Sequence, residues 1–211
     1  MKKKQSIVLI VACVLIAGLT FLGGLCGRIS ALWLKILLLA LCYASMAAVA
    51  VIAMKLSGLK EDFDVKNVKQ YGIGIGVALV LSLFLAFIPA FCGFSLVGAH
   101  KKFTWFGVIY NFLNYFLIVG PVEEFVFRVY IQDALTALFE KQKFVGVLLA
   151  ALLFGLWHWI NGSFVQVLFT FGIGAVFGFS KFLIKDCKYP GLAVGHGLYD
   201  FLNEIVRYFV I

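Results

Sequence analysis

The sequence predicts an all-α polytopic membrane protein, a helical bundle of about seven to eight transmembrane segments with an intramembrane polar cavity. Apolar residues make up 64% of its 211 residues, which is more than a soluble domain of this size can bury. Charged residues make up 13%, about half of the usual ~25%, and the mean hydropathy is +1.06. The apolar residues form long runs rather than alternating segments of about ten residues, which argues against a transmembrane barrel.

The charge and cysteine content exclude other classes of protein. The net charge of +8 is typical of the cationic loops on the cytoplasmic side of a membrane. No basic patch with exposed aromatic residues is present, so we expect a lipid bilayer and no nucleic acid as partner. The cysteines are odd in number and form no CxxC motif, so we interpret them as small apolar fillers; they are Cys13, Cys26, Cys42, Cys92 and Cys187.

Eight apolar segments follow one another along the chain. The first, from about Ser6 to Cys26, is preceded by Lys2–Lys4. It has about 21 residues and no A-x-A cleavage site, which favours a retained transmembrane helix over a signal peptide. The others cover residues 30–54, 70–98, 104–120, 123–139, 144–160, 163–184 and 191–211. The segment 123–139 is short and carries five ionisable or amide side chains, so it needs protein or water around it.

The lysine positions predict the orientation. With the N-terminus in the cytoplasm, Lys2–Lys4 and the polar connector 55–69 are cytoplasmic, as the positive-inside rule requires. The lysines after residue 140 also return to that side if segment 123–139 makes no crossing of its own. From the composition we expect a bacterial plasma membrane. Gly72, Gly74 and Gly76 lie in an apolar run and are predicted to serve helix packing.

The first of three polar clusters begins at Pro121, which is predicted to end one helix and start another. Glu123 and Glu124 then occupy the first turn, where the helix dipole favours carboxylates. Glu124 and Arg128 share a face, whereas Glu123 lies about 140° from Arg128 on a regular helix. We therefore expect Arg128 to neutralise and orient Glu124, and Glu123 to be a candidate general base. The alternative is a buried Glu–Arg pair that only joins helices.

The other two clusters each contain a histidine. Phe154 and His158 are four residues apart, and the alternative reading of His158 is a residue of the membrane interface among tryptophans. His196 and Asp200 have the same spacing, and Asn203 and Arg207 extend their stripe; the alternative here is a polar packing seam. Together the clusters supply two histidines, two glutamates and an aspartate, a set that can activate water or bind a metal.

These motifs resemble those of the CAAX protease and bacteriocin-processing family of intramembrane endopeptidases, which is related to the type II CAAX prenyl proteases. Glu123-Glu124-x-x-x-Arg128, Phe154-x-x-x-His158 and His196-x-x-x-Asp200 agree with that family in order and spacing. The resemblance covers about residues 104–211. It implies a single membrane domain over 1–211, with N-terminal transmembrane helices in 1–103 and a catalytic core in 104–211.

The resemblance also implies roles for these residues. Glu123 and His158 would activate a water, His196 and Asp200 would stabilise the oxyanion, and Glu124 and Arg128 would support them. The last position is often Asn in the family, and an ionised Asp cannot donate a hydrogen bond, so Asp200 would be protonated or would orient His196. The implied substrate is a peptide or membrane protein, cleaved without a cofactor.

Alternatives to this reading stay open at this point. A zinc ion could be held by Glu123, His158 and His196, although the HExxH motif is absent. The chain could instead be a non-enzymatic immunity or partner-binding membrane protein of the same family. A small transporter would need polar groups in both halves of the chain, and residues 1–100 offer few.

Overall fold

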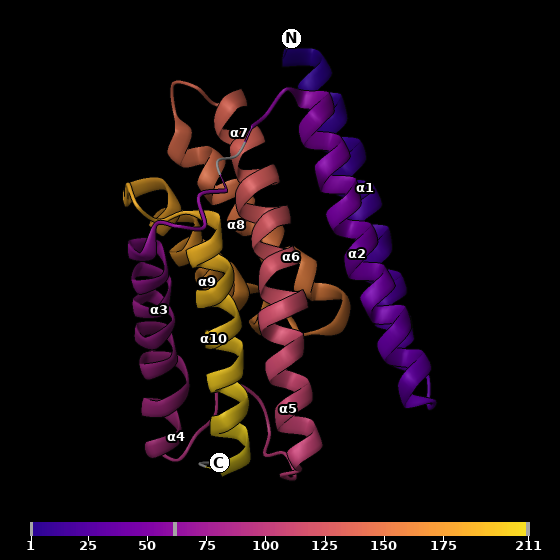
Figure 1. Ribbon diagram of the computed structural model, residues 1–211, viewed down its shortest axis with the longest axis vertical. Coiled ribbons are helices and arrows are strands. Elements are labelled where there is room, and N and C mark those ends of the chain that lie inside the picture. Colours follow the sequence, from indigo (N-terminus) through magenta and orange to yellow (C-terminus); the bar gives the residue numbers. More distant parts are fainter. Residues whose placement is uncertain (1, 61–62, 210–211) are drawn as a thin grey trace. The chain divides into compact units, whose positions relative to one another are not determined.

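The regular structure in the computed structural model is helical throughout the described residues, 2–60 and 63–209 (Figure 1), so the all-α prediction is confirmed. Within them, five helices are long and apolar enough to cross a membrane, judged by length and composition. A sixth apolar helix, Lys143–Trp157, is shorter. The five are Lys3–Cys26, Leu32–Ser57, Val68–Phe91, Trp105–Leu138 and Phe164–Leu183.

The chain divides into two compact units that alternate along the sequence. The first combines residues 1–62 and 125–183, and the second combines residues 63–124 and 184–211. Each unit is therefore assembled from an early and a late part of the chain.

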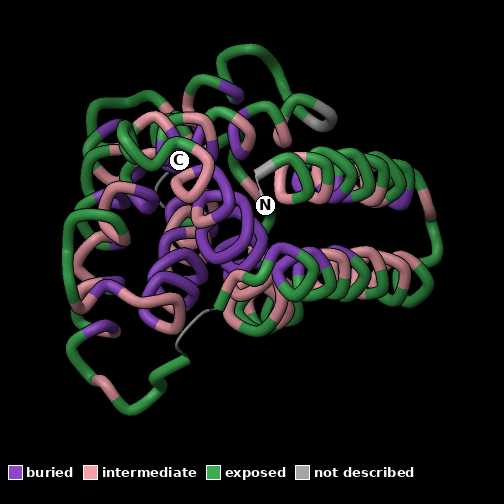
Figure 2. The backbone as a smooth tube through the Cα atoms, turned by 90° about the horizontal axis from the view of Figure 1, so that it is seen from above, coloured by how far each residue is buried: buried purple, intermediate pink, exposed green. Residues whose placement is uncertain are grey.

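The first unit contains a helical hairpin, α1 (Lys2–Cys26) and α2 (Leu32–Ser57), whose helices lie side by side (Figure 1). Gln5 Nε2 donates a hydrogen bond of 3.0 Å to the carbonyl of Ser57, which joins the start of one helix to the end of the other. Much of the surface of this hairpin is exposed and apolar (Figure 2), as expected of helices that face lipid.

The rest of this unit packs through glycines. It contains the π-helical stretch η3 (Phe125–Ile131) and the helices α7 (Gln132–Leu138), α8 (Lys143–Trp157), η4 (His158–Asn161) and α9 (Phe164–Leu183). A Cβ on Gly146 of α8 would lie 2.7 Å from the backbone nitrogen of Thr136 in α7. A Cβ on Gly155 would lie 2.7 Å from the carbonyl oxygen of Val167 in α9. Both contacts require glycine because the backbones approach so closely.

The second unit is built around α10 (Tyr189–Phe209). One partner is α3 (Val68–Ser82), which η1 (Leu83–Phe87) and α4 (Ile88–Phe91) continue. The other is formed by α5 (Trp105–Asn114), η2 (Tyr115–Val119) and α6 (Gly120–Glu124). Figure 1 shows α10 running beside α3 in the same direction.

The prediction that Pro121 breaks the incoming helix is wrong, because the predicted segments 104–120 and 123–139 form one helix, Trp105–Leu138. In a regular α-helix a proline ring clashes with the carbonyl four residues earlier. Here the π-helical turn Tyr115–Val119 precedes the proline, and the N–H of Gly120 donates to the carbonyl of Tyr115. This wider turn gives the ring room. A second π-helical stretch begins at Phe125, so the 140° angle calculated for a regular helix does not apply.

Candidate active site

Close backbone contacts place α10 against both of its neighbours. On one side, a Cβ on Gly195 would lie 2.5 Å from the carbonyl oxygen of Gly74 in α3, and one on Gly191 would collide with Gln70. On the other side, a Cβ on Gly120 of α6 would lie 2.6 Å from the carbonyl oxygen of Ala193. Small residues at such crossings let helices approach closely in membranes. Of the three glycines predicted to serve packing, Gly74 does so, whereas Gly72 and Gly76 face open space.

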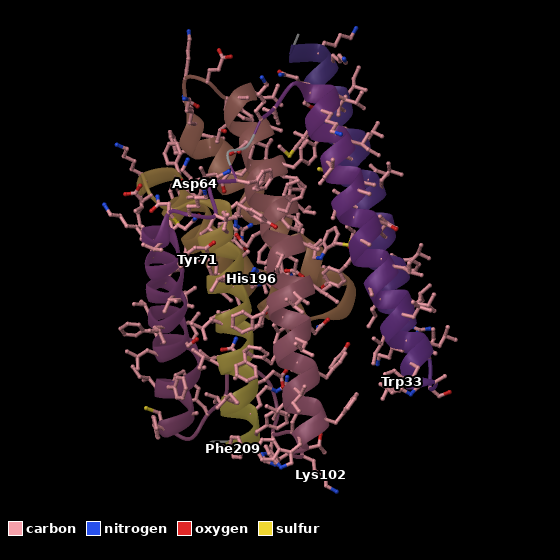
Figure 3. The ribbon with its side chains drawn as sticks, viewed as in Figure 1. Trp33, Asp64, Tyr71, Lys102, His196 and Phe209 are labelled. Atoms are coloured by element: carbon pink, nitrogen blue, oxygen red, sulfur yellow. The ribbon has the colours of Figure 1, made fainter. Side chains whose placement is uncertain are left out.

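His196 lies on α10 between these contacts and binds three carboxylates. Figure 3 shows it nearer to the end of the unit that carries Asp64 than to the end that carries Phe209. Its Nδ1 is 2.8 Å from Oε1 of Glu124. Its Nε2 is 3.8 Å from Oε2 of Glu123 and 3.5 Å from Oδ2 of Asp200.

The arrangement gives the two ring nitrogens different roles. An ionised carboxylate only accepts hydrogen bonds, so Nδ1–H of His196 donates to Glu124. This bond fixes the ring orientation, as a carboxylate commonly does for a functional histidine. Nε2 is then the nitrogen directed towards Glu123 and Asp200. The side chains of His196 and Glu123 are buried, at 5% and 6% exposure, so these interactions lie in a site that largely excludes bulk water.

Tyr189 makes a second connection between α10 and α6. Its hydroxyl donates a hydrogen bond of 3.1 Å to the carbonyl of Pro121, two residues before Glu123. Its ring packs edge-on against Phe63, with centroids 5.5 Å apart. The start of α10 is thus attached to the helix turn that carries both glutamates, and the sequence motifs give no sign of this contact.

A further polar cluster, which lies outside the three motifs, is found near the C-terminal end of α10. Glu204 accepts hydrogen bonds from Lys101 (2.7 Å), Tyr115 (3.0 Å) and Arg207 (3.0 Å). The backbone N–H of Lys101 donates to the carbonyl of Arg207, so the connector before α5 is fastened to α10. Glu204 follows Asp200 by four residues, and this spacing was the signal that could have revealed it.

His158 and Arg128 belong to the first unit, where both contact the ring of Phe154. Nδ1 of His158 lies 2.8 Å from the carbonyl oxygen of Phe154, and the two rings are in edge contact at 4.8 Å. The buried guanidinium of Arg128 lies 4.6 Å from the centroid of Phe154, a cation–π distance. Nζ of Lys181 bonds to the carbonyl of Arg128 (2.9 Å) and to Asp133 (2.8 Å). Phe154 thus links the first two motifs.

The structure therefore brings four predicted site residues together in the second unit, namely Glu123, Glu124, His196 and Asp200. Arg128 and His158 lie in the first unit. Among residues 2–60 and 63–209, no group of three or more His, Cys, Asp or Glu side chains is arranged to hold a metal ion.

The fold and these contacts identify the chain as a helical integral membrane protein with a buried cluster of one histidine and three carboxylates. Residues 104–202, just under half of the chain, match the family described as type II CAAX prenyl endopeptidase Rce1-like. The predicted resemblance is confirmed for residues 104–202, which are similar to this family of CAAX proteases. The family is one of proteases, which supports a peptidase acting on a peptide or protein in a membrane. Comparison with curated proteins and with solved structures gave no significant match.

Proposed function

We propose that the protein is an intramembrane endopeptidase of the glutamic type, which hydrolyses a peptide bond with a water activated by Glu123 and His158. The observation that carries the proposal is the carboxylate cluster around His196. It combines a fixed histidine with a second carboxylate, Glu123, at 3.8 Å on the opposite nitrogen. The pairing of Glu123 with His158 rests on the family motifs.

In the proposed reaction each group has one role. Glu123, with His158, removes a proton from water, and the resulting hydroxide attacks the scissile carbonyl carbon. His196, with a proton on Nε2, donates to the oxyanion of the tetrahedral intermediate. Asp200, whose carboxylate lies 3.5 Å from Nε2, orients that ring. Collapse of the intermediate breaks the C–N bond, and the amine leaves with the proton taken from water. No covalent intermediate is involved.

Glu124 and Arg128 are supporting residues in this proposal. Glu124 holds Nδ1 of His196 and so selects the nitrogen that faces the substrate. Arg128 packs on Phe154, which in turn contacts His158. Both roles concern orientation, because neither residue needs to touch the substrate.

The test is cleavage of a labelled peptide library by purified protein in detergent, with Glu123→Gln compared with wild type. Glu140→Gln makes the same chemical change at an exposed position and serves as the matched control. We expect Glu123→Gln to abolish cleavage, Glu140→Gln to leave it unchanged, and a strong chelator to have no effect. Loss of cleavage with chelator would favour zinc, and folded wild-type protein without any activity would favour a partner-binding protein.

A further inference from the structure

A line of polar side chains runs along α10 from His196 towards the connector before α5. Asp200 lies 3.5 Å from His196. Glu204 lies one turn further along α10 on the same face, and Tyr115 donates a hydrogen bond to it. Glu204 then binds Lys101, whose side chain is 37% exposed. We call Asp200, Tyr115, Glu204 and Lys101 the polar file. It leads from the buried His196 to the partly exposed side chain of Lys101 at the end of the unit.

Two further buried polar atoms lie on the same part of α10 and α3. Gln70 meets Gly191 and Gly74 meets Gly195, so the helices run in register with a constant offset. If the same offset continues for two more helical turns, Ser82 of α3 lies level with Asn203 of α10. The two helices stay close over this stretch, because α10 also contacts η1, which follows Ser82. Ser82 Oγ and Asn203 Oδ1 are buried, and neither atom has a hydrogen-bond partner of normal geometry among the described residues.

Buried polar atoms of this kind require a hydrogen-bonding partner. Leaving one unsatisfied destabilises the fold, and ordered water is the usual partner in protein interiors. Within a bilayer, a polar stripe on a helix faces either other protein or a wet cavity. Asp200 retains 23% exposure, whereas the side chains of His196 and Glu204 beside it are at 5%. Asp200, at the His196 end of the file, is thus the most exposed of the three carboxylates around His196.

We propose that the polar file, with Ser82 and Asn203, is a water-binding path that leads from the connector at Lys101 to His196. This inference rests on the proposed function in one respect, namely that hydrolysis consumes one water for each bond broken. The path gives a buried site access to that water from the end of the unit at which the file terminates. The carboxylates, hydroxyls and amide of the path supply both donors and acceptors for a chain of waters.

The experiment measures thiol reactivity, because a thiol reacts as the thiolate and an apolar environment suppresses that form. Ser82→Cys and Asn203→Cys are made in a background in which the five native cysteines are replaced by alanine. Leu83→Cys is the matched control, since Leu83 follows Ser82 directly but is 48% exposed on an apolar face. A charged, membrane-impermeant methanethiosulfonate reagent is applied to protein in sealed vesicles.

We expect both test thiols to react at least about tenfold faster than the thiol at position 83, and from the same side as the reference variant Lys102→Cys. Equal or slower reaction, or reaction only from the opposite side, would overturn the proposal. Two test positions are used so that one misfolded variant does not decide the result, and gel filtration reports folding.

A kinetic arm uses Tyr115→Phe, which removes only the hydroxyl that donates to Glu204 within the polar file. We expect kcat to fall about tenfold with an unchanged KM, because the substrate is not contacted. An unchanged kcat would contradict the path. The labelling arm needs no activity, so inactive wild-type protein with fast labelling would overturn only the proposed function. Active wild-type protein with unreactive thiols would overturn only this inference.

Discussion

Substitution of Gly120 by alanine tests whether close helix packing sets the geometry of the site. The new Cβ would lie 2.6 Å from the carbonyl oxygen of Ala193 in α10, whereas ordinary contact begins at 3.4 Å. Relief of this overlap requires α6 and α10 to separate by about 0.8 Å, the difference between those two distances. The bond between His196 and Glu124 would then lengthen from 2.8 Å to about 3.6 Å, beyond hydrogen-bonding range.

The expected effect is larger on activity than on stability. Alanine favours a helix by about 1 kcal/mol relative to glycine, and overpacking costs about 1–3 kcal/mol. Gly120→Ala should therefore lower the free energy of unfolding by at most about 2 kcal/mol. A misplacement approaching 1 Å can reduce the rate about 10²-fold, so we expect a fall in kcat of this order.

The assay pairs thermal unfolding in detergent, followed by tryptophan fluorescence, with cleavage of the peptide identified from the library. Gly76→Ala is the control, since nothing lies within 4 Å of its new Cβ and alanine should be neutral or slightly stabilising there. If Gly120→Ala matched Gly76→Ala in both stability and kcat, the link from glycine packing to site geometry would be refuted.

Two further substitutions address the contacts that hold His196 and α6. Tyr189→Phe removes the hydrogen bond to Pro121, and we expect it to reduce the free energy of unfolding by about 0.6–1.7 kcal/mol, measured by thermal unfolding; no reduction would show that this bond does not stabilise α6. Glu124→Gln keeps the shape of the side chain but removes the carboxylate that holds Nδ1 of His196. A loss of about 10–100-fold in kcat is expected, and an unaltered rate would remove Glu124 from the supporting residues.

The fold was largely predictable because the length of each run of apolar residues indicates the length of a membrane-spanning helix. The runs 6–26, 30–54 and 163–184 correspond closely to α1, α2 and α9. The error at Pro121 has a tertiary origin. Proline rules describe a regular α-helix, whereas the π-helical turn Tyr115–Val119 removes the clash. The presence of a proline does not by itself distinguish these two cases.

The candidate site was predictable only as separate helix faces. The four-residue spacing of His196 and Asp200 correctly placed the two side chains together, at 3.5 Å. The bond from His196 to Glu124 spans 72 residues of sequence, and spacing on one helix cannot predict a contact between two. The roles assigned to Glu123 and His158 stay predictions.

Glycine explains how such a distant contact is held in place. Helices in a bilayer gain little from hydrophobic association, because lipid is as apolar as their side chains. Their separation is set by the size of the residues at the crossing, and here Gly74, Gly195 and Gly120 bring three backbones to the shortest spacing. The short imidazole of His196 reaches Glu124 because α6 and α10 are so close. The glycines thus determine the geometry of the polar cluster, although they take no part in its chemistry.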